Sequence, residues 1–157
     1  MKKYILILII ALGLKSTAQN SIPRFVKLTT TEKKSIAQKL DWHDGTILII
    51  NFIMPLKSSA TSTIEETTVA YWNDFYKNFD SEKIKIKLVY SDCTGRKQIK
   101  NSKIINIDED EIIRSTFFPR DKTCSGVAIL NKKGDFKIKS GKYTQENVSE
   151  LISQLEN

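Results

Sequence analysis

The sequence predicts an α/β domain in which a mixed sheet, made of parallel strands and a carboxyl-terminal antiparallel hairpin, is covered by helices on both faces. Residues 46–54 (TILIINFIM) are apolar at almost every position and rich in β-branched side chains, which is typical of a strand buried on both faces. Aromatic and aliphatic residues recur every three or four positions from 64 to 79, which predicts a helix packed on the sheet. Two short segments around the turn 131–134 predict the hairpin, and an amphipathic helix follows it.

The beginning of the chain predicts a secretory signal peptide. Two lysines precede an uncharged run at 4–14, and small residues precede a cleavage site before Gln19. The run is shorter than the ~20 apolar residues that span a bilayer. We therefore expect residues 1–18 to be removed and residues 19–157 to form a single domain without a transmembrane segment, secreted to a periplasm or to the outside of the cell.

The composition limits the class of protein. The formal charge of +7 falls to +4 when residues 1–18, which hold three lysines and no acidic residue, are removed. A charge of this size spread over a whole domain is not typical of nucleic-acid-binding proteins. The 40% hydrophobic content, with six glycines and three prolines, excludes disordered and collagen-like chains. We expect a monomer with no cofactor and no nucleic-acid partner, whose partner is an unidentified protein or another component of the cell envelope.

Capping residues and apolar spacing predict where the elements begin and end. Thr30 or Thr31 is expected to cap the first helix, and Asp108 is expected to cap a short acidic helix. At 84–90, apolar residues alternate with Lys85 and Lys87, which predicts a strand with one face in water. In chain order, we expect a strand at 24–29, a helix from 30 or 31 to 40, a turn at 41–45, a strand at 46–54, a helix from 58 or 59 to 79, a strand at 84–90, a basic loop at 94–103, a strand at 104–107, a helix at 108–117, strands at 127–130 and 135–140, and a helix at 145–155.

Three segments carry a resemblance to a known family. Residues 45–52 (GTILIINF), 127–137 (VAILNKKGDFK) and 141–151 (GKYTQENVSEL) predict, in this order, a strand, a strand–turn–strand, and a glycine followed by a helix. They resemble the thioredoxin-like superfamily, and specifically its secreted TlpA-like thiol-disulfide branch, in which the first of these strands leads into the active site. By element order the resemblance covers 45–155, and it implies the thioredoxin-like mixed sheet.

The catalytic motif of that family is absent. In the family, Asn-Phe is followed a few residues later by Cys-x-x-Cys at the start of the long helix, where the helix dipole and backbone N–H groups lower the pKa of the first thiol. A peroxiredoxin-like register does not restore a thiol, because Ser62 stands at the reactive position and a serine cannot form a disulfide. Counted from Asn51, the Cys-x-x-Cys positions fall on residues without sulfur: Lys57, Ser58, Ser59 and Ala60.

The two cysteines are expected at one edge of the sheet. Cys93 follows the second parallel strand and Cys124 precedes the hairpin, so both lie at the end where the chemistry of the resembling family takes place. In an oxidising compartment we expect a structural disulfide between them, with a redox-active pair and two free thiols as the alternatives. The family's proline before the hairpin is replaced by Cys124, Ser125 and Gly126. Pro55, Ser125 and Gly126 are expected to line a binding mouth.

The other polar clusters are interpreted as surface features. His43 is the single histidine, and with two aspartates in the same turn it lacks the fourth ligand of a metal site. The acidic run 108–111 lacks the glycine and the oxygen spacing of a calcium loop, so no metal is expected. Basic residues gather at 96–103 and 132–142, which we interpret as a solvated loop and the outer face of a hairpin, with anionic polymer binding as the alternative.

These observations predict a secreted thioredoxin-like domain without Cys-x-x-Cys catalysis, acting as a binding or structural module of the cell envelope. The alternatives are an atypical thiol-disulfide oxidoreductase that uses Cys93 and Cys124, and a polyanion-binding envelope protein. We do not expect an enzyme, and if the chain is one, the expected reaction is thiol-disulfide exchange.

Overall fold

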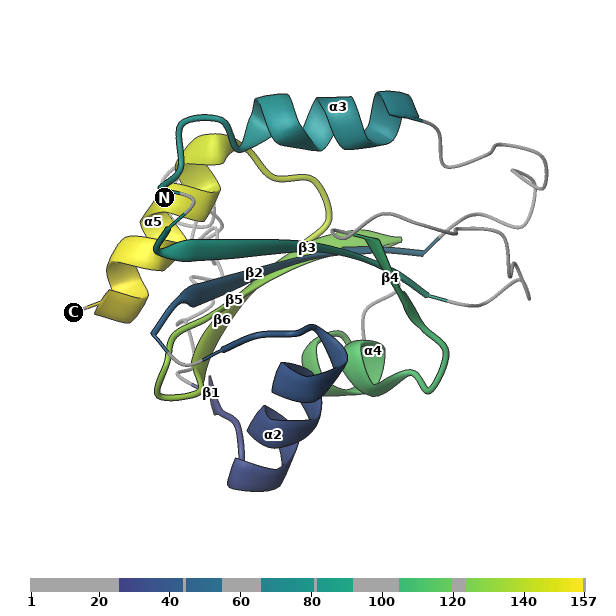
Figure 1. Ribbon diagram of the computed structural model, residues 1–157, viewed down its shortest axis with the longest axis vertical. Helices are drawn as coiled ribbons and strands as arrows, with labels where there is room; N and C mark the ends of the chain where they lie inside the picture. Colours follow the sequence, from purple (N-terminus) through teal and green to yellow (C-terminus); the bar gives the residue numbers. More distant parts are fainter. Residues whose placement is uncertain are drawn as a thin grey trace, which may run out of the picture.

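The computed structural model describes residues 26–43, 45–54, 66–80, 82–91, 105–119 and 124–156 (Figure 1). Within these ranges, the chain forms one six-stranded sheet with the strand order β1-β6-β5-β2-β3-β4. The elements are β1 (Val26–Lys27), α2 (Thr30–Lys39), β2 (Ile47–Ile53), α3 (Glu66–Phe75), β3 (Ile84–Ser91), β4 (Ile105–Asp108), α4 (Ile112–Phe117), β5 (Ser125–Leu130), β6 (Asp135–Ser140) and α5 (Gln145–Glu156).

The sheet combines the two kinds of pairing that the sequence predicts. Strand β2 is parallel to β3, and β3 is parallel to β4. Strand β5 is antiparallel to β2 and forms an antiparallel hairpin with β6, and the short β1 is antiparallel to β6. This order confirms the predicted α/β fold with a mixed sheet, in which the central β2 has a parallel neighbour on one side and the hairpin on the other.

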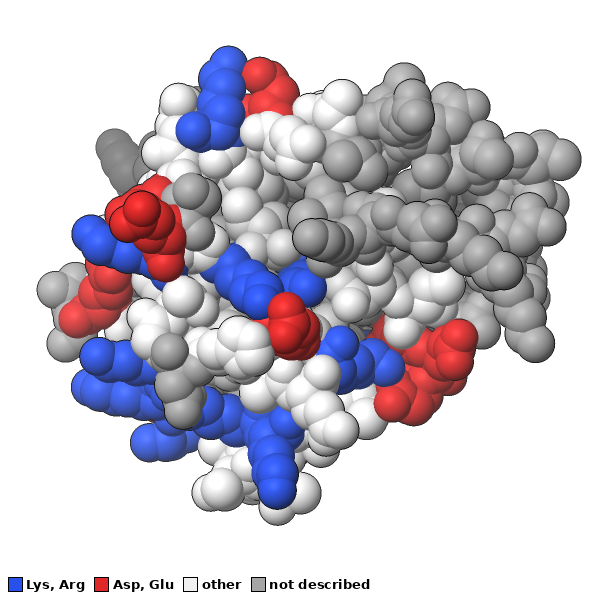
Figure 2. Space-filling view, in the orientation of Figure 1, with Lys and Arg blue, Asp and Glu red and all other residues white. Residues whose placement is uncertain are grey.

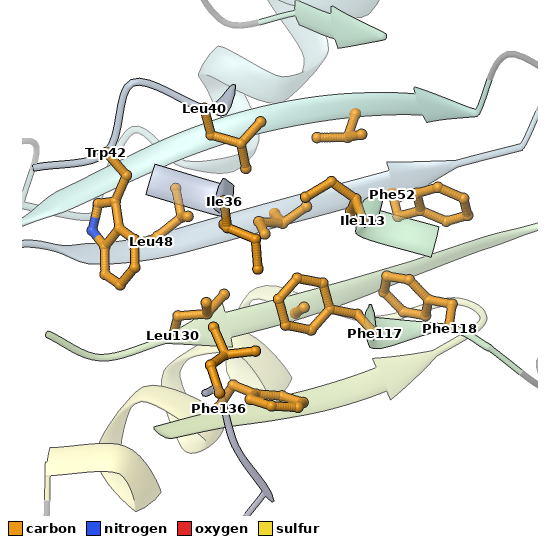
Figure 3. Close-up of a cluster of buried hydrophobic side chains, with 14 residues drawn as sticks. Ile36, Leu40, Trp42, Leu48, Phe52, Ile113, Phe117, Phe118, Leu130 and Phe136 are labelled. Carbon is orange, nitrogen blue, oxygen red and sulfur yellow. The ribbon is translucent and has the colours of Figure 1, made fainter. Parts of the chain in front are cut away.

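Helices cover both faces of the sheet, as predicted. In Figure 1, α2 and α4 lie below the sheet and α3 and α5 lie above it. Because side chains alternate along a strand, β2 sends Leu48, Ile50 and Phe52 into the lower core and Ile49 into the upper core. The strand is therefore buried on both faces, which is why its sequence is apolar without alternation. The lower core (Figure 3) contains Leu28, Ile36, Leu40, Trp42, Leu48, Ile50, Phe52, Val89, Ile113, Phe117, Phe118, Ala128, Leu130 and Phe136.

The start of α2 differs from the prediction by one residue. Thr29, rather than Thr30 or Thr31, caps the helix: its hydroxyl accepts from the Glu32 backbone N–H at 3.2 Å, and the Glu32 carboxylate accepts from the Thr29 backbone N–H at 2.8 Å. This reciprocal pair is a capping box, which needs a threonine three residues before the glutamate. Only Thr29 has that spacing, so the position of Glu32 selects it from three consecutive threonines.

The predicted helix at 108–117 begins later than expected: Asp108 ends β4, Glu111 is the N-cap residue, and α4 begins at Ile112, although the Asp108 side chain does bind the start of the helix. The Asp108 carboxylate oxygens accept from the backbone N–H groups of Ile113 at 3.1 Å and of Arg114 at 2.8 Å. The side chain is fully buried, and the ammonium of Lys39 at the end of α2 lies 3.5 Å from it. Asp108 therefore joins α2, β4 and α4 through one buried carboxylate.

The expected water-facing side of β3 is not in water. Lys87 is only 6% exposed, and the side chain of Lys85 is 29% exposed. Lys85 donates from its ammonium to the Asp41 carboxylate at 2.9 Å, which ties this face of β3 to the end of α2. The prediction was wrong because alternation shows only which side chains share one face of a strand. Whether the face with Lys85 and Lys87 is covered depends on the packing of α2. Burial, followed by the charge of Lys85, lowers the pKa of Lys87.

The aromatic stripe on α3 packs against the sheet, as predicted. Tyr76 is buried in the upper core, and Trp72, Phe75 and Phe79 pack against that core with half-buried rings. The helix ends at Phe75 instead of Phe79, and the chain continues through a turn in which the Phe79 N–H donates to the Tyr76 carbonyl at 3.0 Å. None of the helices in the described ranges is long and apolar enough to cross a membrane.

Candidate functional site

The candidate site lies at the edge of the sheet where β2 ends and β5 begins. Here the Met54 backbone N–H donates to the Cys124 carbonyl at 2.7 Å, which extends the β2–β5 ladder by one step. The next pair in the ladder is Ile53 opposite Ser125, and the Gly141 N–H donates to the Ser125 carbonyl at 2.8 Å. We call Met54, Cys124 and Ser125 the Cys124 corner. Backbone hydrogen bonds on both sides fix its position.

The three side chains at the corner differ in exposure. Cys124 is exposed, whereas Ser125 and Met54 are half-buried. Met54 packs against the lower core, so its thioether joins the corner to the interior. An exposed thiol can act as a nucleophile or form a disulfide once it is deprotonated. Cys124 forms no disulfide with any residue in the described ranges.

Gly126, the other predicted residue of the binding mouth, lies beneath an aromatic ring. A Cβ atom at this position would lie 2.6 Å from Phe118 Cε1 and 3.0 Å from the Lys139 carbonyl oxygen. Phe118 is itself buried and stacks on Phe52, with ring centroids 5.0 Å apart (Figure 3). Gly126 is therefore buried, and a glycine is needed because the Phe118 ring occupies the space of a side chain.

Several predicted site residues lie outside the described ranges. Cys93 is one of them, so its pairing with Cys124 stays a prediction. The same holds for the mouth residue Pro55 and for the positions that replace the Cys-x-x-Cys motif: Lys57, Ser58, Ser59 and Ala60. Of the predicted site, the structure thus brings together Cys124, Ser125 and Gly126.

A buried polar cluster lies next to the corner on the same strand, and the sequence reasoning missed it. The Oδ1 atom of Asn51 accepts from the hydroxyl of Tyr76 at 2.5 Å and from the hydroxyl of Tyr143 at 2.6 Å. Its Nδ2 atom donates to the Lys87 carbonyl at 3.3 Å. Asn51 is fully buried. A lone amide in an otherwise apolar strand must find hydrogen-bond partners, and this was the signal in the sequence that pointed to such a cluster.

The cluster joins three elements of the upper layer. Tyr76 follows α3, Tyr143 precedes α5, and both hydroxyls meet at the side chain that β2 contributes. Gln145 adds a further link, since its side-chain amide donates to the Phe75 carbonyl at 2.5 Å. Burial raises the pKa of Tyr76 and of Tyr143 above the usual tyrosine range, so both hydroxyls are neutral donors at physiological pH. The arrangement is suited to holding two helices on the sheet.

The turn after α2 has the solvated character that the sequence predicts. The side chain of His43 is 80% exposed, and its Nε2 atom lies 3.1 Å from the Asp41 carboxylate. The hydrogen bond from Lys85 is the main cause that lowers the pKa of Asp41. Among the residues with described positions, no group of three or more His, Cys, Asp or Glu side chains is arranged to hold a metal ion.

Comparison with known proteins gives similarity in fold only. No protein-family model and no curated protein matches the sequence. One similar solved structure is the solution structure of a candidate thioredoxin from Neisseria meningitidis, which is 17% identical, with a TM-score of 0.46 over 75% of this chain and 77% of that chain. Another is the crystal structure of StoA from Bacillus subtilis, which is 21% identical, with a TM-score of 0.44 over 70% of this chain and 84% of that chain.

Proposed function

We propose that the protein is a secreted thioredoxin-like domain that binds a partner in the cell envelope at the Cys124 corner, without Cys-x-x-Cys catalysis. The observation that carries the proposal is the corner itself: an exposed side chain held on both sides by backbone hydrogen bonds at the end of the central strand. In open α/β sheets, ligands bind outside the carboxyl ends of the strands, at the point where the strand order reverses. Strand β2 ends at such a point, between β3 and β5.

The absence of a dithiol motif supports binding over catalysis. The chain has two cysteines, at positions 93 and 124, so no pair has the two-residue spacing that closes a disulfide at a helix end. Substrate capture and release by exchange needs a resolving thiol close to the attacking thiol. A corner held by backbone hydrogen bonds presents a surface of fixed shape, which lowers the entropy cost of binding.

Site-specific cross-linking in the native host tests this proposal. A benzophenone group attached to Cys124 in the Cys93→Ser variant should give a discrete cross-linked partner after irradiation. The matched control carries the same group on Lys133→Cys in a background with both natural cysteines changed to serine. Lys133 is exposed and lies in the turn at the far end of the hairpin from Cys124. A product at Cys124 that is absent at Lys133→Cys supports the proposal, whereas no product, or the same product at both positions, overturns it.

A second candidate function is thiol-disulfide exchange by Cys124 and Cys93. The observation that favours it is the exposure of Cys124 at the carboxyl end of the parallel strands. In this reaction a thiolate attacks a substrate disulfide to form a mixed disulfide, and the second cysteine displaces the reduced substrate. In this second function the resting protein carries a reactive pair of cysteines. In the binding proposal the two cysteines form a structural disulfide or remain as unreactive thiols.

Three measurements on the same variants separate these functions. A structural bridge predicts slow alkylation of the native protein and a loss of about 3 kcal/mol of stability in the double Cys→Ser variant. A catalytic pair predicts rapid labelling of one cysteine, little loss of stability, and reduction of an insulin-type disulfide that disappears in Cys124→Ser. We expect no turnover above the free dithiol background. Turnover that depends on either cysteine would reverse this ranking.

A further inference from the structure

A basic surface lies at the far end of the hairpin from the Cys124 corner. Strand β5 runs from Ser125, beside the corner, to Leu130, and the turn that follows brings β6 back. A strand of this length separates its two ends by roughly 20 Å. Figure 2 shows a group of blue side chains at the lower left, over β1, the β5–β6 turn and α2. We define the turn-end surface by six residues of these three segments: Val26, Lys27, Lys33, Lys34, Lys132 and Lys133.

Hydrogen bonds hold the three elements of this surface together. The Leu28 backbone N–H donates to the Gly134 carbonyl at 2.9 Å, which fixes β1 against the turn. The Lys33 ammonium donates to the Lys132 carbonyl at 2.7 Å, which fixes α2 against the same turn. The charges therefore belong to a surface of defined shape, although they come from three segments far apart in the sequence.

The surface has an excess of positive charge. The surface holds five lysines, and the two carboxylates next to them in the sequence are both engaged: Glu32 in the capping box, and Asp135 with Lys27 at 4.0 Å and with the Asn131 amide. Lys132 and Lys133 are exposed, and the side chain of Lys27 is 65% exposed. The exposed ammonium groups of Lys132 and Lys133 can approach an anionic partner at the turn, and Lys27 lies on the strand that borders it.

Val26, an exposed aliphatic residue, lies on the same face of β1 as the buried Leu28, which is the side covered by α2 with its Lys33 and Lys34, whereas Lys27 points to the opposite face. Val26 is 44% exposed, and it is one of only two large hydrophobic residues in the described ranges with high exposure. Lysines around an apolar side chain fit an anionic bilayer, because the headgroups pair with the ammonium groups while the acyl boundary accepts the apolar group. A soluble polyanion has a place for the lysines but none for the valine. We propose that the turn-end surface binds anionic lipid headgroups at a membrane surface.

Vesicle co-sedimentation tests this proposal. The full secreted chain is mixed with vesicles that contain about one third phosphatidylglycerol in phosphatidylcholine, and with vesicles of phosphatidylcholine alone. We expect binding to the anionic vesicles that weakens as salt is added. The variant with Lys27, Lys132 and Lys133 all changed to Gln should bind roughly a hundredfold more weakly, since each of the three lysines contributes about a fivefold factor near such a surface. Val26→Ser should weaken binding to vesicles with no change in net charge.

The matched control removes the same charge elsewhere. Lys77, Lys83 and Lys142 are exposed and lie outside the turn-end surface, so changing all three to Gln should leave vesicle binding close to that of the unmodified protein. All variants must keep the melting temperature of the parent, which exposed lysines permit. An equal loss of vesicle binding in the control and the test variant would mean that binding depends only on net charge, and would overturn the proposal. Binding to dextran sulfate without binding to anionic vesicles would also overturn it, in favour of a soluble polyanion.

Discussion

The cluster around Asn51 gives a prediction whose size follows from its hydrogen bonds. Asn51→Leu keeps the volume of the side chain but removes the acceptor of the buried Tyr76 hydroxyl and of the half-buried Tyr143 hydroxyl. Each hydroxyl left without a partner costs about 1 to 3 kcal/mol. Because the two hydroxyls also hydrogen-bond one another, one of them can stay paired, and the variant should lose about 1 to 6 kcal/mol of the ~5 to 15 kcal/mol that stabilises a domain of this size. Tyr143→Phe, which leaves Asn51 with its Tyr76 donor, should cost only about 1 kcal/mol.

A triple variant separates loss of the acceptor from loss of shape. When Asn51→Leu is combined with Tyr76→Phe and Tyr143→Phe, no hydroxyl is left unpaired, so at least half of the lost stability should return. Urea unfolding monitored by circular dichroism measures each free energy, and an unchanged m value confirms that the native state keeps its compactness. If Asn51→Leu alone does not fold, a triple variant that folds would still show that the unpaired hydroxyls caused the loss. A triple variant no more stable than Asn51→Leu would refute the reasoning, because unpaired hydroxyls would then not explain the loss.

Three further predictions concern stability. Asp108→Asn should cost about 2 kcal/mol in urea unfolding, since the start of α4 loses one of two charge-assisted acceptors. Burial raises the pKa of Tyr76 and Tyr143 in the folded state above the unfolded value, so stability should be fully present below about pH 10 and fall above it, and a variant with both tyrosines changed to Phe should fall less. Gly126→Ala should cost about 1 to 3 kcal/mol, because its Cβ overlaps the Phe118 ring, and the cost should shrink in a Phe118→Leu background, where the overlapping Cε1 atom is missing. An equal cost in both backgrounds would contradict the assignment to that ring.

Local patterns were sufficient for the parts of the fold that depend on one segment at a time. The strand at 46–54 is apolar on both faces because each face packs into a core, and this pattern is visible directly in the sequence. The cap of α2 was misplaced by one residue because three threonines in a row are equivalent until the glutamate is counted. The covered face of β3 could not be predicted, since whether Lys87 is buried depends on where α2 packs.

The same distinction between local pattern and tertiary packing explains which parts of the candidate site could be predicted. Element order alone predicted that Cys124 and Ser125 lie at the carboxyl edge of the parallel strands, because strand direction fixes which ends meet. The cover over Gly126 was not predictable, since Phe118 reaches it through tertiary packing and no spacing rule relates the two. The role of Asn51 could have been predicted, because a single amide in an apolar strand requires hydrogen-bond partners. One of them, Tyr76, belongs to the aromatic stripe that was predicted to pack on that strand.

The two proposed surfaces are related through the hairpin that joins them. Strand β5 begins at the Cys124 corner and ends beside the turn-end surface, and its ladder with β2 and β6 keeps the two ends at a fixed separation. An anionic bilayer bound at the turn would therefore hold the corner roughly 20 Å from the headgroups, turned away from the membrane. That orientation leaves the exposed thiol and its hydrogen-bonded backbone open to a partner in solution. Lipid binding at one end and partner binding at the other are thus compatible, and they act on non-overlapping residues that can be changed independently.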